Sequence, residues 1–147
     1  MEDLPQLCEL LTELFGQEAD FAPNQDKQMA GLRLILETPN MGRLFVLRQE
    51  GIVVGMINVL ITISTHQGGI VLLLEDLIVR HAWRRRGAAS ALIRHAVAFA
   101  NSIGAPRITL LTDSSNERAI RLYQKHGFSA SKMLAMRWLA GESPVVG

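Results

Sequence analysis

The chain has 147 residues, of which 48% are hydrophobic and 20% are charged. This length and this ordinary mixture predict a single globular domain over residues 1–147, and they exclude a disordered or collagen-like chain. The single cysteine, Cys8, excludes an internal disulfide and a cysteine-rich zinc site. Because no apolar run approaches the roughly 18 residues that a membrane span needs, we expect a soluble, cytoplasmic protein.

The net charge of +1 hides an asymmetry along the chain. Residues 1–76 carry 4 Lys or Arg and 11 Asp or Glu, whereas residues 77–147 carry 11 and 3. One interpretation is that the C-terminal half binds an anion and the N-terminal half attracts a cation. The other is that the two halves attract each other across the fold.

The first half of the chain predicts two helices followed by strands. Apolar residues at helical spacing predict a helix over residues 4–15 and a second over residues 28–37, which stops before Pro39. The polar residues 16–27 between them predict a loop. Runs rich in Val, Ile and Leu then predict strands at 43–48, 52–64 and 70–79, with a hairpin turn at 65–69.

The second half alternates between helices and strands. Apolar residues at steps of three and four predict a helix over residues 87–103, followed by a short strand over 107–112. Ser114 and Glu117 have the spacing of a capping box, which opens a helix that Gly127 ends. Residues 128–138 predict one or two last strands. The whole order is that of a mixed α/β domain.

The junction between the strand at 70–79 and the following helix predicts an anion site. Arg84, Arg85 and Arg86 stand where the positive end of the helix dipole lies, so an anion between them and the free N–H groups would balance the charge. Gly87, Ala88 and Ala89 are small enough to let a phosphate approach the backbone. The alternative is a solvated basic turn. The run lacks the glycine patterns of phosphate-binding-loop and dinucleotide-binding proteins.

Two motifs around this junction resemble a known family. Arg84-x-x-Gly87-x-Ala89 is similar to the Arg/Gln-x-x-Gly-x-Gly/Ala signature of the GNAT superfamily of acetyl-CoA-dependent N-acetyltransferases. Asn116-x-x-Ala119-x-x-Leu122-Tyr123-x-Lys125-x-Gly127-Phe128 resembles a second segment of that family almost position for position. The resemblance covers about residues 69–128. It implies the GNAT fold, in which helices flank a mixed, mostly antiparallel central sheet.

The resemblance also implies a cosubstrate, acetyl-CoA, and the residues that bind it. In the family, the backbone N–H groups of the signature loop hold the pyrophosphate, and the edge of the preceding strand pairs with the pantetheine. Asn116 contacts the cofactor in many members. These roles fall here on Leu77, Ile78, Val79, Arg84, Arg85, Arg86, Gly87, Ala88, Ala89 and Asn116.

Two side chains are candidates for the chemistry. The resemblance makes Tyr123 the general acid, and a phenol can protonate a departing thiolate without carrying charge at rest. The alternative is a core aromatic.

Glu75 interrupts an apolar strand, and burial would raise its pKa toward that of a useful base. Leu74-Glu75-Asp76 resembles the strand of spermidine/spermine and sugar-amine acetyltransferases, where the glutamate acts through water. In a regular strand Asp76 would face the other way, whereas a bulge would undo that alternation. Glu75 could instead be a structural partner of an arginine.

The acceptor is predicted to be a small-molecule amine. Attack on a thioester needs a neutral amine, and the acidic N-terminal half favours a cationic one. The alternatives are a protein N-terminus or lysine, or a non-catalytic CoA-binding regulatory module. We expect no nucleic acid, because few aromatic residues accompany the arginines, no membrane, and no metal, because the four histidines lack ligand spacing.

The start of the chain departs from the family pattern. Members begin with a strand, whereas Leu4 and Pro5 here read as the start of a helix, so the first strand is missing. The sheet then has one strand fewer and an open edge, which must be covered or paired with another chain. On that ground we expect a homodimer.

Overall fold

The computed structural model describes residues 1–17 and 22–143. In chain order the elements are α1 (Leu4–Gln17), α2 (Gln25–Glu37), β1 (Gly42–Gln49), β2 (Ile52–Ser64), β3 (Gly69–Val79), the 3-10 turn η1 (His81–Trp83), α3 (Ala88–Ser102), β4 (Ile108–Leu110) and α4 (Glu117–Lys125). No helix in these two ranges is long and apolar enough to cross a membrane.

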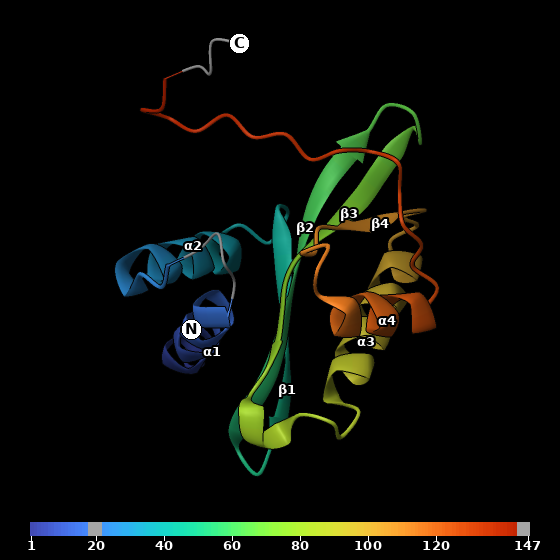
Figure 1. Cartoon of the computed structure of the whole chain (residues 1–147). Coiled ribbons are helices and arrows are strands. Elements are labelled where there is room, and N and C mark those ends of the chain that lie inside the picture. The colour runs from blue at the N-terminus through green and yellow to red at the C-terminus, as the bar shows by residue number, and fades with distance from the viewer. Residues whose placement is uncertain (18–21, 144–147) are drawn as a thin grey trace.

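Four strands form one sheet in the order β1-β2-β3-β4. The pairs β1–β2 and β2–β3 are antiparallel, and β3–β4 is parallel. Helices α1 and α2 cover one face, and α3 and α4 lie on the other (Figure 1). The predicted mixed, mostly antiparallel sheet between helices is therefore confirmed. Residues 1–3 form no strand before α1, and β1 is an outer strand of the described sheet.

Each face of the sheet has its own apolar core. On the α1 side, Leu7, Leu10 and Leu11 recur at helical spacing and pack with Val53 and Met56 of β2. On the other side, the successive β2 positions Ile57 and Val59 pack against the small-residue face of α3. Gly55 permits that approach, because a Cβ there would lie 3.1 Å from the Ile78 carbonyl oxygen and from Leu92 Cδ1.

Ion pairs join α1 to the chain that follows β3. Arg80 Nη2 lies 3.1 Å from Glu9 Oε2, and Arg84 Nη2 lies 2.7 Å from Glu13 Oε1. Part of the charge asymmetry is therefore attraction between the two halves of the chain, which was the second interpretation.

Two local predictions are wrong. The cap of α4 is Asn116, whose Oδ1 accepts from the Ala119 N–H at 3.2 Å, so Ser114 and Glu117 do not form a capping box. Residues 128–138 form no strand, because no neighbouring strand in the described chain pairs with them. Extended structure needs such a partner to satisfy its N–H and C=O groups.

The helix at 28–37 begins three residues earlier than expected, because Asn24 caps Gln25 onward.

Candidate active site

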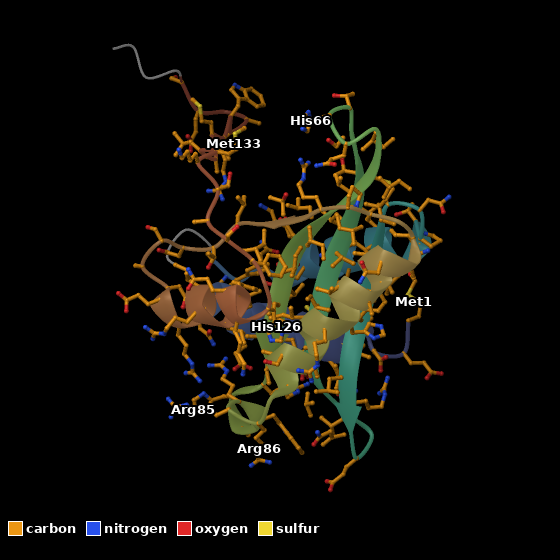
Figure 2. All side chains as sticks on the ribbon, turned by 90° about the vertical axis from the view of Figure 1, so that its right-hand side faces the viewer. Met1, His66, Arg85, Arg86, His126 and Met133 are labelled. Atoms are coloured by element: carbon orange, nitrogen blue, oxygen red, sulfur yellow. The ribbon has the colours of Figure 1, made fainter. Side chains whose placement is uncertain are left out.

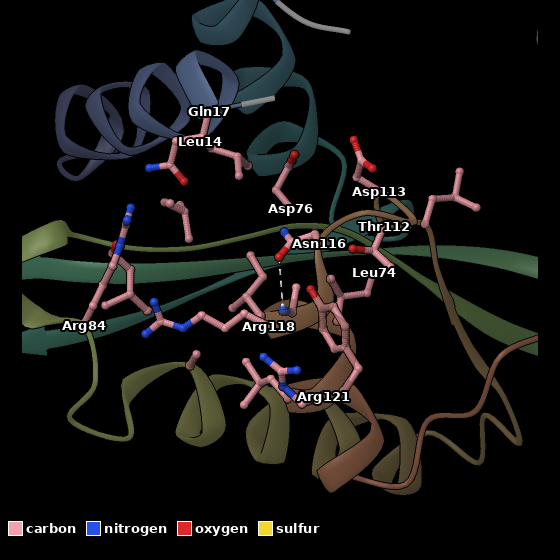
Figure 3. A pocket seen from close by; sticks show the side chains of 18 of the residues that line it. Leu14, Gln17, Leu74, Asp76, Arg84, Thr112, Asp113, Asn116, Arg118 and Arg121 are labelled. Atoms are coloured by element: carbon pink, nitrogen blue, oxygen red, sulfur yellow. Dashed lines mark hydrogen bonds between the residues drawn. The ribbon is translucent and has the colours of Figure 1, made fainter. Parts of the chain in front are cut away.

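A cavity of about 1450 Å³ opens between the end of α1, the second half of β3 and the starts of α3 and α4 (Figure 3). It brings together nearly all of the predicted site residues. Those that line it are Glu75, Leu77, Ile78, Val79, Arg84, Arg85, Gly87, Ala88, Ala89, Asn116 and Tyr123. Arg86 does not line this cavity but a smaller one beside it.

The start of α3 is built to leave its backbone donors free. Arg85 has a φ of 63° and Gly87 a φ of 79°, so the chain turns sharply into the helix. No side chain caps the helix, whereas Asn24 and Asn116 cap α2 and α4. The first N–H groups of a helix have no intrahelical acceptor and attract anions. A Cβ on Gly87 would meet nothing within 4 Å, so the approach to these donors is open. The loop therefore offers open backbone donors to an anion.

The three arginines of this loop have different surroundings. Arg84 is tied to the scaffold, because besides its ion pair with Glu13 its Nε donates to the Val79 carbonyl at 3.0 Å. The Arg86 guanidinium lies 5.3 Å from the centre of the Trp83 ring. Only Arg85 is both exposed and at the main cavity. Of the three predicted arginines, Arg85 is therefore the one best placed to face an anion in the main cavity.

Sequence reasoning missed three cations on the opposite wall. Arg118, Arg121 and Lys125 of α4 line the same cavity as Arg85; Figure 3 shows the first two. Their spacing of three and four residues places them on one helix face, and this spacing was the available signal. Together with Arg85 they make one end of the cavity strongly basic.

The edge of β3 is open where the resemblance implies a ligand. Pairing with β4 ends at Leu74 and Leu110, so from Glu75 onward β3 has no strand on that side. The open stretch includes Leu77, Ile78 and Val79, whose backbone groups can pair with an extended amide chain. The Val79 carbonyl already accepts from Arg84, which leaves it one lone pair.

A bulge in β3 brings two adjacent carboxylates to the cavity. Asp76 pairs with Asn58 and Leu74 pairs with Val59, so Glu75 is an extra residue without a partner on β2. Alternation breaks at such a point. The bulge alternative therefore holds in place of the regular strand, and both carboxylates line the cavity.

The two carboxyl groups differ in burial. Glu75 is exposed at the cavity, although desolvation by the surrounding protein raises its pKa, with a smaller rise from Asp76. The Arg137 guanidinium opposes this and lowers the pKa of Glu75. Asp76 is the more enclosed of the two, and desolvation raises its pKa while the hydrogen bond from Asn58 lowers it. Glu75 was expected to be buried, but Asp76 is the more buried of the two carboxyl groups.

Asn58 and Asp76 form a polar pair inside the sheet. Asn58 Nδ2 donates to Asp76 Oδ2 at 3.0 Å, and Asn58 is only 3% exposed. Asn58 Oδ1 is buried without a hydrogen-bond donor among the described groups. An unsatisfied acceptor beside a carboxylate costs free energy, and an N–H donor would relieve that cost. Of the pair only Asp76 lines the cavity, and Asn58 holds its carboxylate in place from inside the sheet.

Tyr123 faces the cavity from α4, across from β3. Its ring packs against Phe128 with centroids 5.8 Å apart, and it is partly buried against the core of β2, β3 and α3. Asn116 is used as the α4 cap, so its Oδ1 already holds a hydrogen bond. Among residues 1–17 and 22–143, no three His, Cys, Asp or Glu side chains are grouped to hold a metal ion.

Known proteins resemble this chain in both sequence and fold. The family model described as "Acetyltransferase (GNAT) family" matches residues 4–128. A transcriptional regulator from Bacillus halodurans C-125 is 26% identical, with a TM-score of 0.78 over 93% of this chain and 94% of that one.

Two aminoglycoside acetyltransferases have similar structures. One, meta-AAC0020 from an uncultured soil metagenomic sample, was solved with trehalose; it is 21% identical, with a TM-score of 0.75 over 96% of this chain and 91% of that one. The other, AAC(6')-Iy, was solved in complex with CoA; it is 19% identical, with a TM-score of 0.79 over 95% of this chain and 90% of that one.

Proposed function

Because the chain belongs to the acetyltransferase (GNAT) family, we propose that it transfers an acetyl group from acetyl-CoA to a primary amine. The acceptor is a small cationic amine, and the transfer is direct, within a ternary complex. One observation carries the proposal: a single cavity joins the uncapped start of α3 to the carboxylates Glu75 and Asp76.

The basic end of the cavity suits the nucleotide portion of acetyl-CoA. Backbone N–H groups at Gly87, Ala88 and Ala89 would hold the diphosphate, and Arg85 would neutralise part of its charge. The open edge of β3 from Leu77 to Val79 would align the pantetheine so that its thioester points toward Glu75. The cosubstrate supplies an activated acetyl group and a thiolate leaving group.

The acidic end suits the acceptor. Asp76, whose Oδ2 accepts a hydrogen bond from Asn58 Nδ2, would hold the substrate as an ammonium ion. Glu75, whose pKa is raised, then takes one proton from the reacting nitrogen through a water molecule. The neutral nitrogen forms a bond to the acetyl carbon as the carbon–sulfur bond breaks. Tyr123 gives its proton to the departing sulfur, and the second proton that the nitrogen must lose on becoming an amide returns to the Tyr123 oxygen, so the step is balanced.

A thiol-release assay tests this function. The purified protein is given acetyl-CoA and one of three acceptors: a polyamine, an aminoglycoside or a lysine-containing peptide. We expect release with at least one small cationic amine and a loss of at least tenfold in kcat for Glu75→Gln. Release with the peptide alone would favour a protein acetyltransferase. Binding of acetyl-CoA with no release for any amine would favour a non-catalytic CoA-binding module.

A further inference from the structure

The C-terminal end of α4 is closed by a compact turn that includes Tyr123. The N–H groups of His126 and Phe128 both donate to the Tyr123 carbonyl, at 3.0 and 3.1 Å, and the Gly127 N–H donates to the Gln124 carbonyl at 3.0 Å. This is a Schellman motif, and Gly127 takes the left-handed conformation that it requires, with a φ of 90°. Because the Tyr123 and Phe128 rings also pack together, the turn is one rigid unit.

A side chain of this turn reaches the start of α3. His126 Nε2 lies 2.9 Å from Ser90 Oγ, although the two residues are 36 positions apart in the chain. Figure 2 shows His126 between α4 and α3. Ser90 follows Ala88 and Ala89 in α3 and lines the active-site cavity, whereas His126 does not. The hydrogen bond therefore joins the wall that carries Tyr123 to the wall that carries the backbone donors.

Helix α4 packs against the domain less deeply than α3 does. Helix α3 buries Leu92, Ile93 and Ala96, whereas no residue of α4 is fully buried, and α4 is described over its whole length. Tyr123 itself is only partly buried against the core. Elements with few buried apolar groups move at a low cost in free energy. The position of Tyr123 therefore depends on the contacts at the end of α4, of which the bond from His126 to Ser90 is one.

We propose that His126 is a positioning residue for acetyl transfer. Through Ser90 it fixes the end of α4 to the start of α3, and it thereby sets where the Tyr123 hydroxyl meets the departing sulfur. The inference rests on the proposed function, in which α3 holds the cosubstrate and Tyr123 protonates the sulfur. Loss of this bond leaves the Tyr123 hydroxyl chemically intact but misplaced, so it should slow the transfer without preventing the binding of acetyl-CoA.

The thiol-release assay on four folded variants, checked by circular dichroism, tests the proposal. We expect His126→Ala to lower kcat roughly tenfold and to leave the KM for acetyl-CoA within about twofold of the wild type. His126→Gln, whose amide nitrogen can still donate to Ser90 Oγ, should recover most of that loss. Ser90→Ala should lower kcat as His126→Ala does, and combining the two should add little. Gln124→Ala, at an exposed residue of the same turn outside the cavity lining, is the matched control and should keep the wild-type kcat.

Nuclear magnetic resonance follows the position of Tyr123 without turnover. Tyr123 is the one tyrosine of the chain, so a sample with labelled tyrosine reports on this ring alone. We expect its ring resonances to shift in His126→Ala and Ser90→Ala, because the ring moves relative to Phe128 and the core. They should return toward the wild-type values in His126→Gln and stay at those values in Gln124→Ala.

The two measurements separate this inference from the proposed function. An active wild type whose kcat is unchanged by His126→Ala would overturn the inference and leave the proposed function standing. A fall in kcat with unmoved Tyr123 resonances, or one that His126→Gln does not recover, would also overturn it, because His126 would then act elsewhere. A wild type that releases no thiol with any amine would be a failure of the proposed function, and it would end the role of His126 in transfer even if the Tyr123 resonances still shifted.

Discussion

The two ends of the active-site cavity are built on different principles. At the basic end, the donors are backbone N–H groups at the uncapped start of α3, backed by Arg85 and the cations of α4. At the acidic end, the groups are side chains, Glu75 and Asp76, which a bulge in β3 brings to the same cavity. The first end needs an open backbone, and the second needs carboxylates with controlled protonation.

This difference decides which substitutions matter at each end. A backbone site is insensitive to most side-chain changes nearby, but it is blocked by any side chain that occupies the space in front of the N–H groups. A carboxylate site depends on single atoms, so an isosteric change is enough to alter it. The predictions below use both properties.

The largest effect is expected from Gly87→Glu. A glutamate there places a negative side chain in the open space before the α3 donors, where the diphosphate would bind. We expect the affinity for acetyl-CoA to fall at least 100-fold, about 2.7 kcal/mol, in a calorimetric titration. Gly68→Glu is the matched control, because Gly68 has a φ of 73° and an equally open surround but lies in the β2–β3 turn. It should bind acetyl-CoA as the wild type does. Equal losses in the two variants would contradict a diphosphate site at α3.

Next in size is Tyr123→Phe at the junction of the two ends. The change removes only the hydroxyl and keeps the ring that packs against Phe128. We expect kcat to fall roughly 100-fold, which is typical for loss of a general acid, with the KM for acetyl-CoA unchanged. Phe128→Leu, which disturbs the ring contact but keeps the hydroxyl, should change kcat much less. An unchanged kcat in Tyr123→Phe would show that Tyr123 is a core aromatic only.

The sequence located the α3 loop of the basic end but missed the cations of α4 opposite it, and it left the orientation of Asp76 at the acidic end open. Glycine and a turn into a helix are local features, so the loop at 84–89 could be located from its own residues. The bulge at Glu75 is a property of the pairing between β3 and β2, so period-two alternation alone could not decide the orientation of Asp76.

The same contrast between local sequence and pairing with a neighbour explains the outcome for two predicted strands. The strand at 52–64 was predicted to the residue, since Val, Ile and Leu fill most of its positions. The strand expected at 128–138 was wrong, because an apolar alternating pattern predicts a strand but cannot supply the neighbour that the strand requires.

A smaller change is expected from Asp76→Asn, which should raise the stability of the protein and weaken its binding of the amine. The pKa of Asp76 is raised, so the folded protein holds this proton more tightly than the unfolded chain does. The contribution of Asp76 to the free energy of unfolding is therefore most favourable at low pH. That contribution falls as the pH rises from the usual pKa of an aspartate to the raised pKa in the folded protein. Removing the charge should stabilise the protein by about 1 kcal/mol at pH 8 and by almost nothing at pH 3. Activity should move the other way, with a rise of roughly tenfold in the KM for the amine.

Urea unfolding at the two pH values measures the first effect, and Asp113→Asn is its control at the same cavity. Hydrogen bonds from the backbone and side chain of Ser115 lower the pKa of Asp113, so this variant should lose stability at pH 8 relative to pH 3. If Asp76→Asn destabilised the protein at pH 8, the carboxylate would be a structural group that the fold needs, and its proposed role in holding the amine would fail.

The smallest effect is expected from Glu13→Gln, which tests whether Arg84 belongs to the scaffold or to the basic end. The Arg84–Glu13 pair is partly buried, with side chains 28% and 31% exposed, whereas Glu9 in the Arg80 pair is 63% exposed. Screening by water limits such pairs to about 1 kcal/mol, and to less when one partner is mostly solvated. We therefore expect urea unfolding to show a loss below about 1 kcal/mol for Glu13→Gln and no measurable loss for Glu9→Gln. Because Arg84 still donates to the Val79 carbonyl in both variants, acetyl-CoA affinity should stay within twofold of the wild type. A change of tenfold or more in Glu13→Gln alone would instead place the charge of Arg84 among the groups that face the diphosphate.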